Sequence, residues 1–260
     1  MTVFPDAVPL PVAADRPDAI FFDMVGCLED VRSTPEDRAR ARRRLHRLLT
    51  QIGVRLPRRV FEAAFIAGRE AYYRWRDESL RELPPERIWL EYFLRDLLDD
   101  QSRQTVAAAA ETLMVAYDES YYRRRLRPGV RRVLQALQRR DYRLGIISNV
   151  CSRTIVPRNL ARYGIADRFE AVILSSVSTH RKPGPQIFHI AAQMLGIPPH
   201  RCAYVGDTVN RDINGAVAAG FGITVLIPSA LTVEKDSELT YQAAPTHVIG
   251  EFRELLAIFP

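Results

Sequence analysis

Short apolar runs that end in small or polar residues recur along this chain of 260 residues and constrain its fold most strongly. Each run is too short for a buried helix, and helix-like stretches separate the last four runs, which predicts a parallel sheet. We therefore expect a doubly wound α/β fold. The runs are residues 19–23, 143–149, 171–176, 201–207 and 221–227, and the expected helices are 129–140, 153–163, 184–195 and 210–219.

A long block without strand signals separates the first apolar run from the second. Prolines at its expected helix starts and apolar residues at helical spacing predict four helices, with the aromatic residues packing them together. The expected helices are residues 35–51, 57–77, 85–100 and 102–125. The sequence thus predicts a loose segment 1–18, a core domain of residues 19–32 and 127–260, and an inserted helical domain of residues 33–126.

The composition argues against several classes of function. The net charge is +6, but the arginines are spread over helices beside acidic residues, which indicates a solvated surface rather than a nucleic-acid site. No apolar run reaches the length of a membrane-spanning helix, and the proline-broken start does not resemble a signal peptide. Three cysteines without a C-x-x-C pair favour neither a disulfide framework nor a zinc site, so we expect a cytoplasmic protein.

Polar residues follow the expected strands at the points where each strand ends. Asp23 follows the first run, Ser148 and Asn149 end the second, and Asp207 ends the fourth. Ligands of open α/β sheets bind at the carboxyl ends of the strands, so these side chains are the first candidates for chemistry.

The order and surroundings of these residues resemble the four motifs of the haloacid dehalogenase-like hydrolase superfamily. The segments are FFDMVGCLED with Asp23, GIISNV with Ser148 and Asn149, HRKPGPQIF with Lys182, and YVGDTVNRDINGAVAAG with Asp207 and Asp212. The resemblance covers residues 19 to about 227. It implies that the helical insert is a four-helix cap of the kind that many members carry after the first motif.

The resemblance implies a role for each of these residues, and their chemistry agrees with it. Asp23 would be the nucleophile that forms an aspartyl-phosphate, with Lys182, Ser148 and the Asn149 backbone amide binding the phosphate oxygens. Asp23, Asp207 and the Val25 carbonyl would hold Mg²⁺, a cation that favours oxygen ligands. Asp212 is expected as a second carboxylate that orients the lysine or a metal-bound water.

Val25 departs from the pattern, because phosphatases of this group carry a second aspartate there that protonates the leaving group. General acid–base assistance is typically a ~10²–10⁴-fold effect, so the loss is large. Four interpretations follow. The chain is a phosphohydrolase that uses another acid or an easy leaving group, a 2-haloacid dehalogenase, a phosphonate-cleaving enzyme, or a protein that binds a phospho-ligand or a partner protein without catalysis.

Two observations argue against the dehalogenase and the phosphonate-cleaving interpretations. Dehalogenase relatives dispense with the metal-binding acid that Asp207 provides, and phosphonate enzymes need a lysine in the cap, whereas residues 30–125 contain none. A magnesium-dependent phosphohydrolase therefore remains the main hypothesis. Glu29 and Asp30 are the nearest acids in sequence that could replace the missing one.

The expected substrate is a small phosphorylated or otherwise anionic molecule, and the insert offers candidates to bind it. Arg69, Tyr73 and Arg76, with Tyr72 beside them, lie on one expected helix and could face an anion, although core packing explains them equally well. Cys27 occupies the position where relatives carry threonine, and we expect it to be a small polar replacement rather than a nucleophile.

Overall fold

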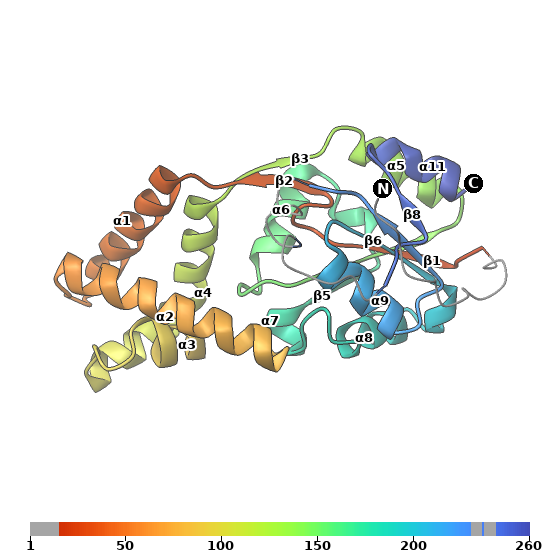
Figure 1. Ribbon diagram of the computed structural model, residues 1–260. Helices are drawn as coiled ribbons and strands as arrows, with labels where there is room; N and C mark the ends of the chain where they lie inside the picture. Colours follow the sequence, from red (N-terminus) through yellow and green to blue (C-terminus); the bar gives the residue numbers. More distant parts are fainter. Residues whose placement is uncertain (1–15, 230–235, 237–242) are drawn as a thin grey trace, which may run out of the picture.

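The computed structural model describes residues 16–229, 236 and 243–260, and its centre is a six-stranded parallel sheet with the strand order β5-β4-β1-β6-β7-β8 (Figure 1). The five predicted strands and the α/β fold class are confirmed. The sixth strand was missed because it is only two residues long. The strands are β1 (Ala19–Phe22), β4 (Arg143–Ser148), β5 (Ala171–Leu174), β6 (Cys202–Gly206), β7 (Ile223–Leu226) and β8 (His247–Val248).

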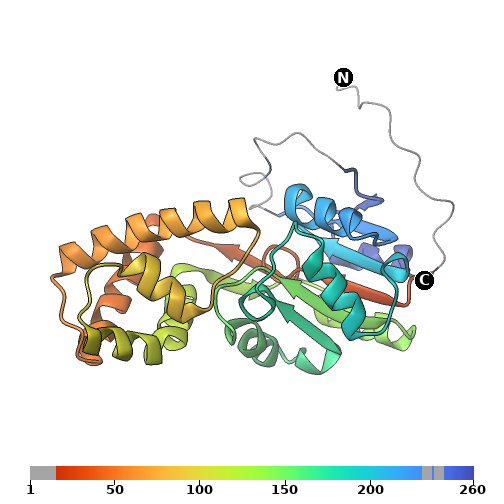
Figure 2. The same ribbon diagram turned by 90° about the horizontal axis from the view of Figure 1, so that it is seen from below.

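Helices cover both faces of the sheet, because successive side chains of a strand point to opposite faces (Figure 2). In β1, Ile20 and Phe22 join one apolar cluster, whereas Ala19 and Phe21 join another. The first cluster packs against α5 (Val130–Arg139), α6 (Ile155–Tyr163) and α11 (Leu255–Ile258), and the second against α8 (Gln186–Met194) and α9 (Asn214–Ala218). Short elements are α7 (Ser175–Ser178), η2 (Ala166–Arg168), η3 (Pro199–Arg201), η4 (Val209–Ile213) and η5 (Phe252–Glu254).

Residues 35–121 form a helical insert with an apolar core of its own, to one side of the sheet (Figure 1). Its helices are α1 (Pro35–Gln51), α2 (Arg58–Ser79), α3 (Pro85–Ile88), the π-helix η1 (Trp89–Phe93) and α4 (Asp100–Tyr121). Phe65 lies at the centre of this core, with ring centroids 4.8 Å from Phe93, 5.4 Å from Tyr117 and 5.9 Å from Trp89. The expected role of aromatic residues in packing these helices is confirmed for Phe61, Phe65 and Tyr72, which are buried.

Two of the helix predictions in the insert are wrong at their ends. The helix expected over 85–100 stops at Phe93, and Leu94–Asp99 is irregular before the Asp99 side chain caps α4. The helix expected over 102–125 stops at Tyr121, because β3 (Arg123–Leu126) pairs with β2 (Glu29–Arg32) in an antiparallel ribbon. Arginine–carboxylate pairs, with Arg124 2.7 Å from Glu29 and Arg125 3.0 Å from Asp30, stabilise this ribbon.

The ribbon is the covalent connection of the insert to the sheet, since it leads into α1 and out of α4. The N-terminal segment predicted as loose lies outside the described residues as far as residue 15. In the described part of the chain, no helix combines the length and the apolar character needed to cross a bilayer.

Candidate active site

Lys182 lies at the centre of a buried polar cluster at the carboxyl end of the sheet. Its ammonium is 2.8 Å from Asp23 and 2.6 Å from Asp212, and it also donates to the Tyr204 hydroxyl at 2.8 Å. Burial alone would lower the pKa of Lys182, but Asp212 and Asp23 outweigh it and the net shift is upward. The raised pKa means that the lysine carries its positive charge at neutral pH.

Asp212 joins the lysine to the loop that follows β6. Its Oδ1 accepts from Lys182, and its Oδ2 accepts from the Asp207 and Thr208 amides at 3.2 and 3.0 Å and from the Thr208 hydroxyl at 2.6 Å. Burial opposes ionisation, but the charge of Lys182 overrides it and lowers the pKa of Asp212. The carboxylate therefore orients both the lysine and the Asp207 loop.

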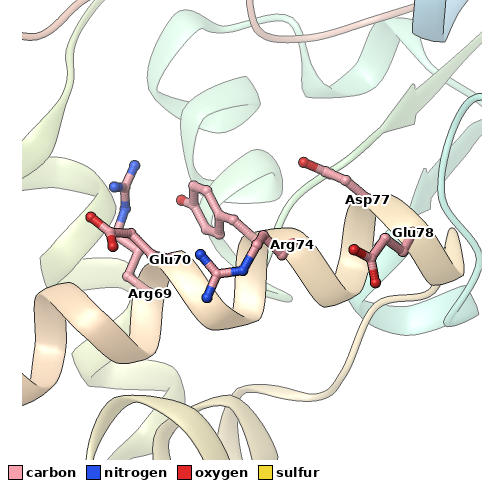
Figure 3. A pocket seen from close by; sticks show the side chains of 6 residues that line it. Arg69, Glu70, Arg74, Asp77 and Glu78 are labelled. Carbon is pink, nitrogen blue, oxygen red and sulfur yellow. The ribbon is translucent and has the colours of Figure 1, made fainter.

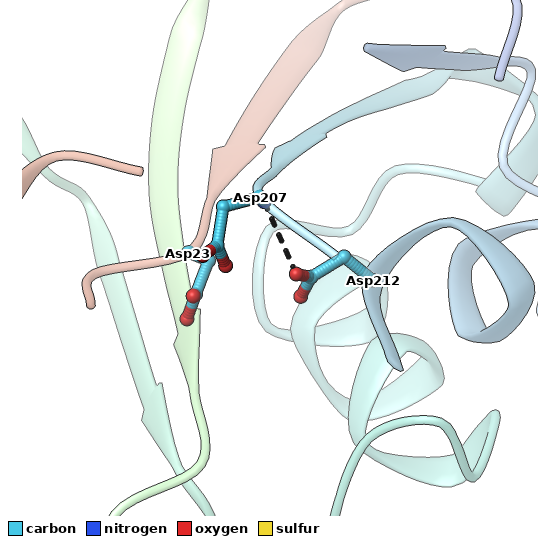
Figure 4. Close-up of side chains that lie close together, drawn as sticks. All are labelled: Asp23, Asp207 and Asp212. Atoms are coloured by element: carbon cyan, nitrogen blue, oxygen red, sulfur yellow. Dashed lines mark hydrogen bonds between the residues drawn. The ribbon is translucent and has the colours of Figure 1, made fainter. Parts of the chain in front are cut away.

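Asp23, Asp207 and Asp212 each offer a carboxylate oxygen, and the three oxygens lie within 4.8 Å of one another (Figure 4). Asp23 follows β1 and Asp207 follows β6, which are neighbours in the sheet, so the topology brings the two acids together. Gly26, with φ +100°, leaves room for them, because a Cβ at this position would lie 2.0 Å from Asp207 Oδ2. Three carboxylates this close together form a donor set that suits a hard divalent cation.

Ser148 and Asn149 end β4 beside this cluster, but their side chains have different surroundings. Asn149 is reciprocally bonded to the Lys182 backbone, donating to its carbonyl and accepting from its amide, both at 2.9 Å. The Asn149 side chain thus fixes the lysine, and only its backbone amide is left for the predicted contact with phosphate. Ser148 Oγ is buried and has no hydrogen-bond partner among the described residues.

Val25 cannot give a proton to a leaving group, and burial raises the pKa of Glu29, the residue with which it forms a β-bridge. Val25 packs against the apolar cluster of the sheet. Cys27 is buried and donates to the Val205 carbonyl, and burial, reinforced by Asp23, raises the pKa of its thiol, which disfavours a thiolate there. Glu29 and Asp30 lie in the ribbon, where arginines of β3 hold their carboxylates.

The three predicted substrate-binding residues of the insert are found on α2. Arg69 donates to the hydroxyls of Tyr117 and Tyr121 at 2.8 and 3.2 Å, so its contacts lie within the insert. Arg76 stacks 3.5 Å above the Tyr73 ring and reaches Cys151, in the loop after β4, at 3.9 Å. Of the three side chains, Arg76 is thus the one with a contact to the loop beside the lysine cluster.

A hollow of about 560 Å³ lies along α2, lined by residues of this helix alone (Figure 3). Its lining residues are Arg69, Glu70, Tyr73, Arg74, Asp77 and Glu78. Three acids face two arginines there, so the hollow is a poor site for a phosphate dianion. The lysine cluster, with its charged donor and carboxylates from three segments, is the better candidate for chemistry.

A family model described as a haloacid dehalogenase-like hydrolase matches residues 17–220, which include every residue of the lysine cluster. The chain belongs to the haloacid dehalogenase-like hydrolases. The resemblance predicted from the four motifs is therefore confirmed.

Curated relatives of this chain carry phosphatase names, and solved structures share its fold. The chain is 33% identical to a phosphoglycolate phosphatase of Nitrosococcus oceani over 51% of this chain and 59% of the relative. It is 34% identical to a glyceraldehyde 3-phosphate phosphatase of Methanopyrus kandleri over 53% and 57% of the two chains. The matches thus span less than two thirds of these relatives. A solved 2-haloacid dehalogenase from Pseudomonas syringae pv. Tomato DC3000 superposes with a TM-score of 0.62 at 20% identity, covering 93% and 97% of the chains, which shows the shared fold.

Sequence reasoning missed two residues that shape the site, Tyr204 and Gly26. Tyr204 Oη accepts from Lys182 and lies 3.2 Å from both Asp212 and the Ile147 carbonyl. The feature of the sequence that could have pointed to Tyr204 is its hydroxyl group, which lies inside the otherwise apolar strand β6. Gly26 was missed because the need for it arises only where Asp207 approaches from another strand.

The cluster predicts a large stability cost for Lys182→Met, which leaves Asp23 and Asp212 buried without their shared cation. We expect a loss of ~3–5 kcal/mol in the free energy of unfolding, measured by urea denaturation without divalent cations. Lys182→Met combined with Asp212→Asn should lose less. The control Arg87→Met, which breaks the exposed pair with Glu91, should cost at most about 1 kcal/mol. Equal losses for Lys182→Met and Arg87→Met would contradict this account of the cluster.

Proposed function

We propose that this protein is a magnesium-dependent phosphohydrolase that acts on a small phosphorylated metabolite through a phosphoryl group carried on Asp23. The observation that supports it best is the convergence of Asp23, Asp207, Asp212 and Lys182 at one edge of the sheet. The phosphatase names of two relatives, which belong to those proteins, agree with this chemistry. We further propose that residues 33–126 act as a cap domain on a core of residues 19–32 and 127–260.

The reaction would use the residues of the chain as follows. A carboxylate oxygen of Asp23 attacks phosphorus, and the bond between phosphorus and the leaving oxygen breaks with its electron pair going to that oxygen. Lys182 and Ser148 donate hydrogen bonds to the phosphate oxygens, and the ammonium of Lys182 offsets part of their charge. Water then attacks phosphorus of the aspartyl-phosphate, the bond between phosphorus and the Asp23 oxygen breaks with its electron pair returning to the carboxylate, and one proton of the water is lost to an oxygen of the released phosphate.

Mg²⁺ would be held by Asp23, Asp207 and the Val25 carbonyl, with Asp212 close behind them. A bound Mg²⁺ supplies positive charge that offsets the repulsion between the carboxylate and the phosphate dianion. The carboxylate cluster and the close approach that Gly26 permits suit a cation of this kind.

Arg76 and Tyr73 are the proposed contacts to the part of the substrate beyond the phosphate. Arg76 reaches the loop after β4, and its charge suits an anionic or hydroxylated substituent. Arg69, which lies 4.3 Å above the Tyr73 ring and bonds to two tyrosines, would hold Tyr73 in place and contribute positive charge.

Mg²⁺ should raise the thermal stability of the wild type, because a ligand that binds only the folded state stabilises it by mass action. The expected gain is about 1.4 kcal/mol when Mg²⁺ is tenfold above its dissociation constant. Asp207→Asn should abolish the gain, whereas Asp167→Asn, on an exposed side chain, should keep it. The proposal of a magnesium site fails if melting curves show no gain in the wild type or an equal gain in Asp207→Asn.

Because Val25 cannot protonate a leaving group, we expect the protein to prefer substrates whose leaving groups depart as anions. Acetyl phosphate and p-nitrophenyl phosphate, whose leaving groups depart readily as anions, should turn over much faster than sugar phosphates. Val25→Asp should raise sugar phosphate hydrolysis by up to ~10²–10⁴-fold by supplying a general acid, and Val25→Asn, of similar size but without an acid, should not.

Steady-state kinetics on these substrates separates the alternatives. Rapid hydrolysis of sugar phosphates by the wild type would show that another acid replaces the missing one. The absence of phosphate turnover in both wild type and Val25→Asp would instead favour a protein that binds a phospho-ligand without catalysis, and halide release from a 2-haloacid would favour a dehalogenase.

A further inference from the structure

The segment between α2 and α3 is a second connection between the helical insert and the sheet, besides the ribbon. Its backbone pairs with the segment that precedes Lys182: the Glu82 amide donates to the Thr179 carbonyl at 3.0 Å, and the Arg181 amide donates to the Leu80 carbonyl at 3.1 Å. Arg81 and His180 form a β-bridge between these two bonds. The insert is therefore joined by its backbone to the residue next to the lysine.

Glu82 brings a carboxylate from this segment into the interior, where it is only 2% exposed. One of its oxygens accepts from the Arg181 guanidinium and from the Ser175 hydroxyl, the latter at 2.8 Å. The other accepts from the Tyr72 hydroxyl and from Cys151 Sγ, the latter at 3.7 Å. Both carboxylate oxygens are thus fully engaged, three of the four contacts being to residues of the α/β part of the chain.

These contacts reach both loops that surround Lys182. Arg181 directly precedes the lysine in the chain. Ser175 Oγ also accepts from the Val150 amide at 2.9 Å, and Val150 follows Asn149, whose side chain holds the Lys182 backbone. Glu82 is thereby linked to the lysine along two independent routes.

Burial distinguishes the Glu82–Arg181 pair from another ion pair between the insert and the sheet, Glu86–Arg153. The side chain of Arg181 is 3% exposed and that of Glu82 is fully buried, so loss of the carboxylate would leave a buried guanidinium charge facing the more distant Asp77 carboxylate, at 3.9 Å. Glu86 and Arg153 also pair across the insert and the sheet, at 2.7 Å, but their side chains are 35% and 38% exposed. Solvent would replace that second contact at little cost.

We propose that Glu82 is a positioning residue of the active site, which fixes Lys182 and the loop after β4 through Arg181 and Ser175. The lysine then holds its place beside Asp23 only while the α2–α3 segment is docked on the sheet. The kinetic part of this inference rests on the proposed phosphohydrolase function, whereas the placement of Lys182 does not.

The matched variants Glu82→Gln and Glu86→Gln test the proposal, with p-nitrophenyl phosphate as substrate. Glu82→Gln should lower kcat by about 10²-fold, the effect of misplacing a catalytic group by roughly 1 Å, while KM changes much less. Glu86→Gln should keep the wild-type kcat. Equal kcat values for Glu82→Gln and the wild type would overturn the proposal.

A crystal structure of Glu82→Gln gives a readout that does not depend on the proposed function. The Lys182 ammonium should move out of hydrogen-bond distance of Asp23, from which it is 2.8 Å in the wild type. A lysine that stays in place would overturn the inference, even if the wild type hydrolyses no phosphate and the function itself proves wrong.

Glu82→Gln combined with Arg181→Met covers the case in which the single variant does not fold, because it removes both buried charges together. Its melting temperature should return toward the wild-type value while kcat stays low and Lys182 stays displaced. Recovery of kcat together with stability would show that Glu82 serves stability alone, and would overturn the positioning role.

Discussion

The ammonium of Lys182 is the one charge on which the site depends. Asp23 and Asp212 are buried within hydrogen-bond distance of it, and two carboxylates in such a setting stay ionised only where a cation offsets their repulsion and their loss of water. The Asn149 amide fixes the backbone of the lysine, and Tyr204 fixes its side chain. Much of the polar structure at the carboxyl edge of the sheet therefore serves to place one side chain.

The cluster also requires the backbone at two glycines to lie close to the aspartate side chains. Gly26 and Gly206 leave space that a methyl group would fill, against the carboxylates of Asp207 and Asp212 respectively. The acids can thus lie near one another without strain, at the ends of neighbouring strands. Under the proposed function, this arrangement would serve phosphoryl transfer, and the apolar side chain of Val25 would restrict the reaction to leaving groups that need no proton.

The sequence predicted the sheet and the ends of its strands well, because both follow from local patterns: apolar runs, and the polar residues that terminate them. It could not predict the ribbon, since the charged segments Glu29–Arg32 and Arg123–Leu126 become strands only by pairing with each other across the insert. Tyr204 and Glu82 were missed for a related reason. Their importance comes from partners far away in the chain, and a buried tyrosine or an acid in a linker is ordinary by itself.

The proposal that Asp23 is the nucleophile is tested most directly by identifying the side chain that carries the phosphoryl group during turnover. Acetyl phosphate and Mg²⁺ should be mixed with the protein, quenched in acid within one turnover, and the peptides analysed by mass spectrometry. We expect one added phosphoryl group, carried by Asp23 and absent from Asp23→Asn. Turnover that proceeds without a phosphoryl group on Asp23, or in Asp23→Asn, would contradict it.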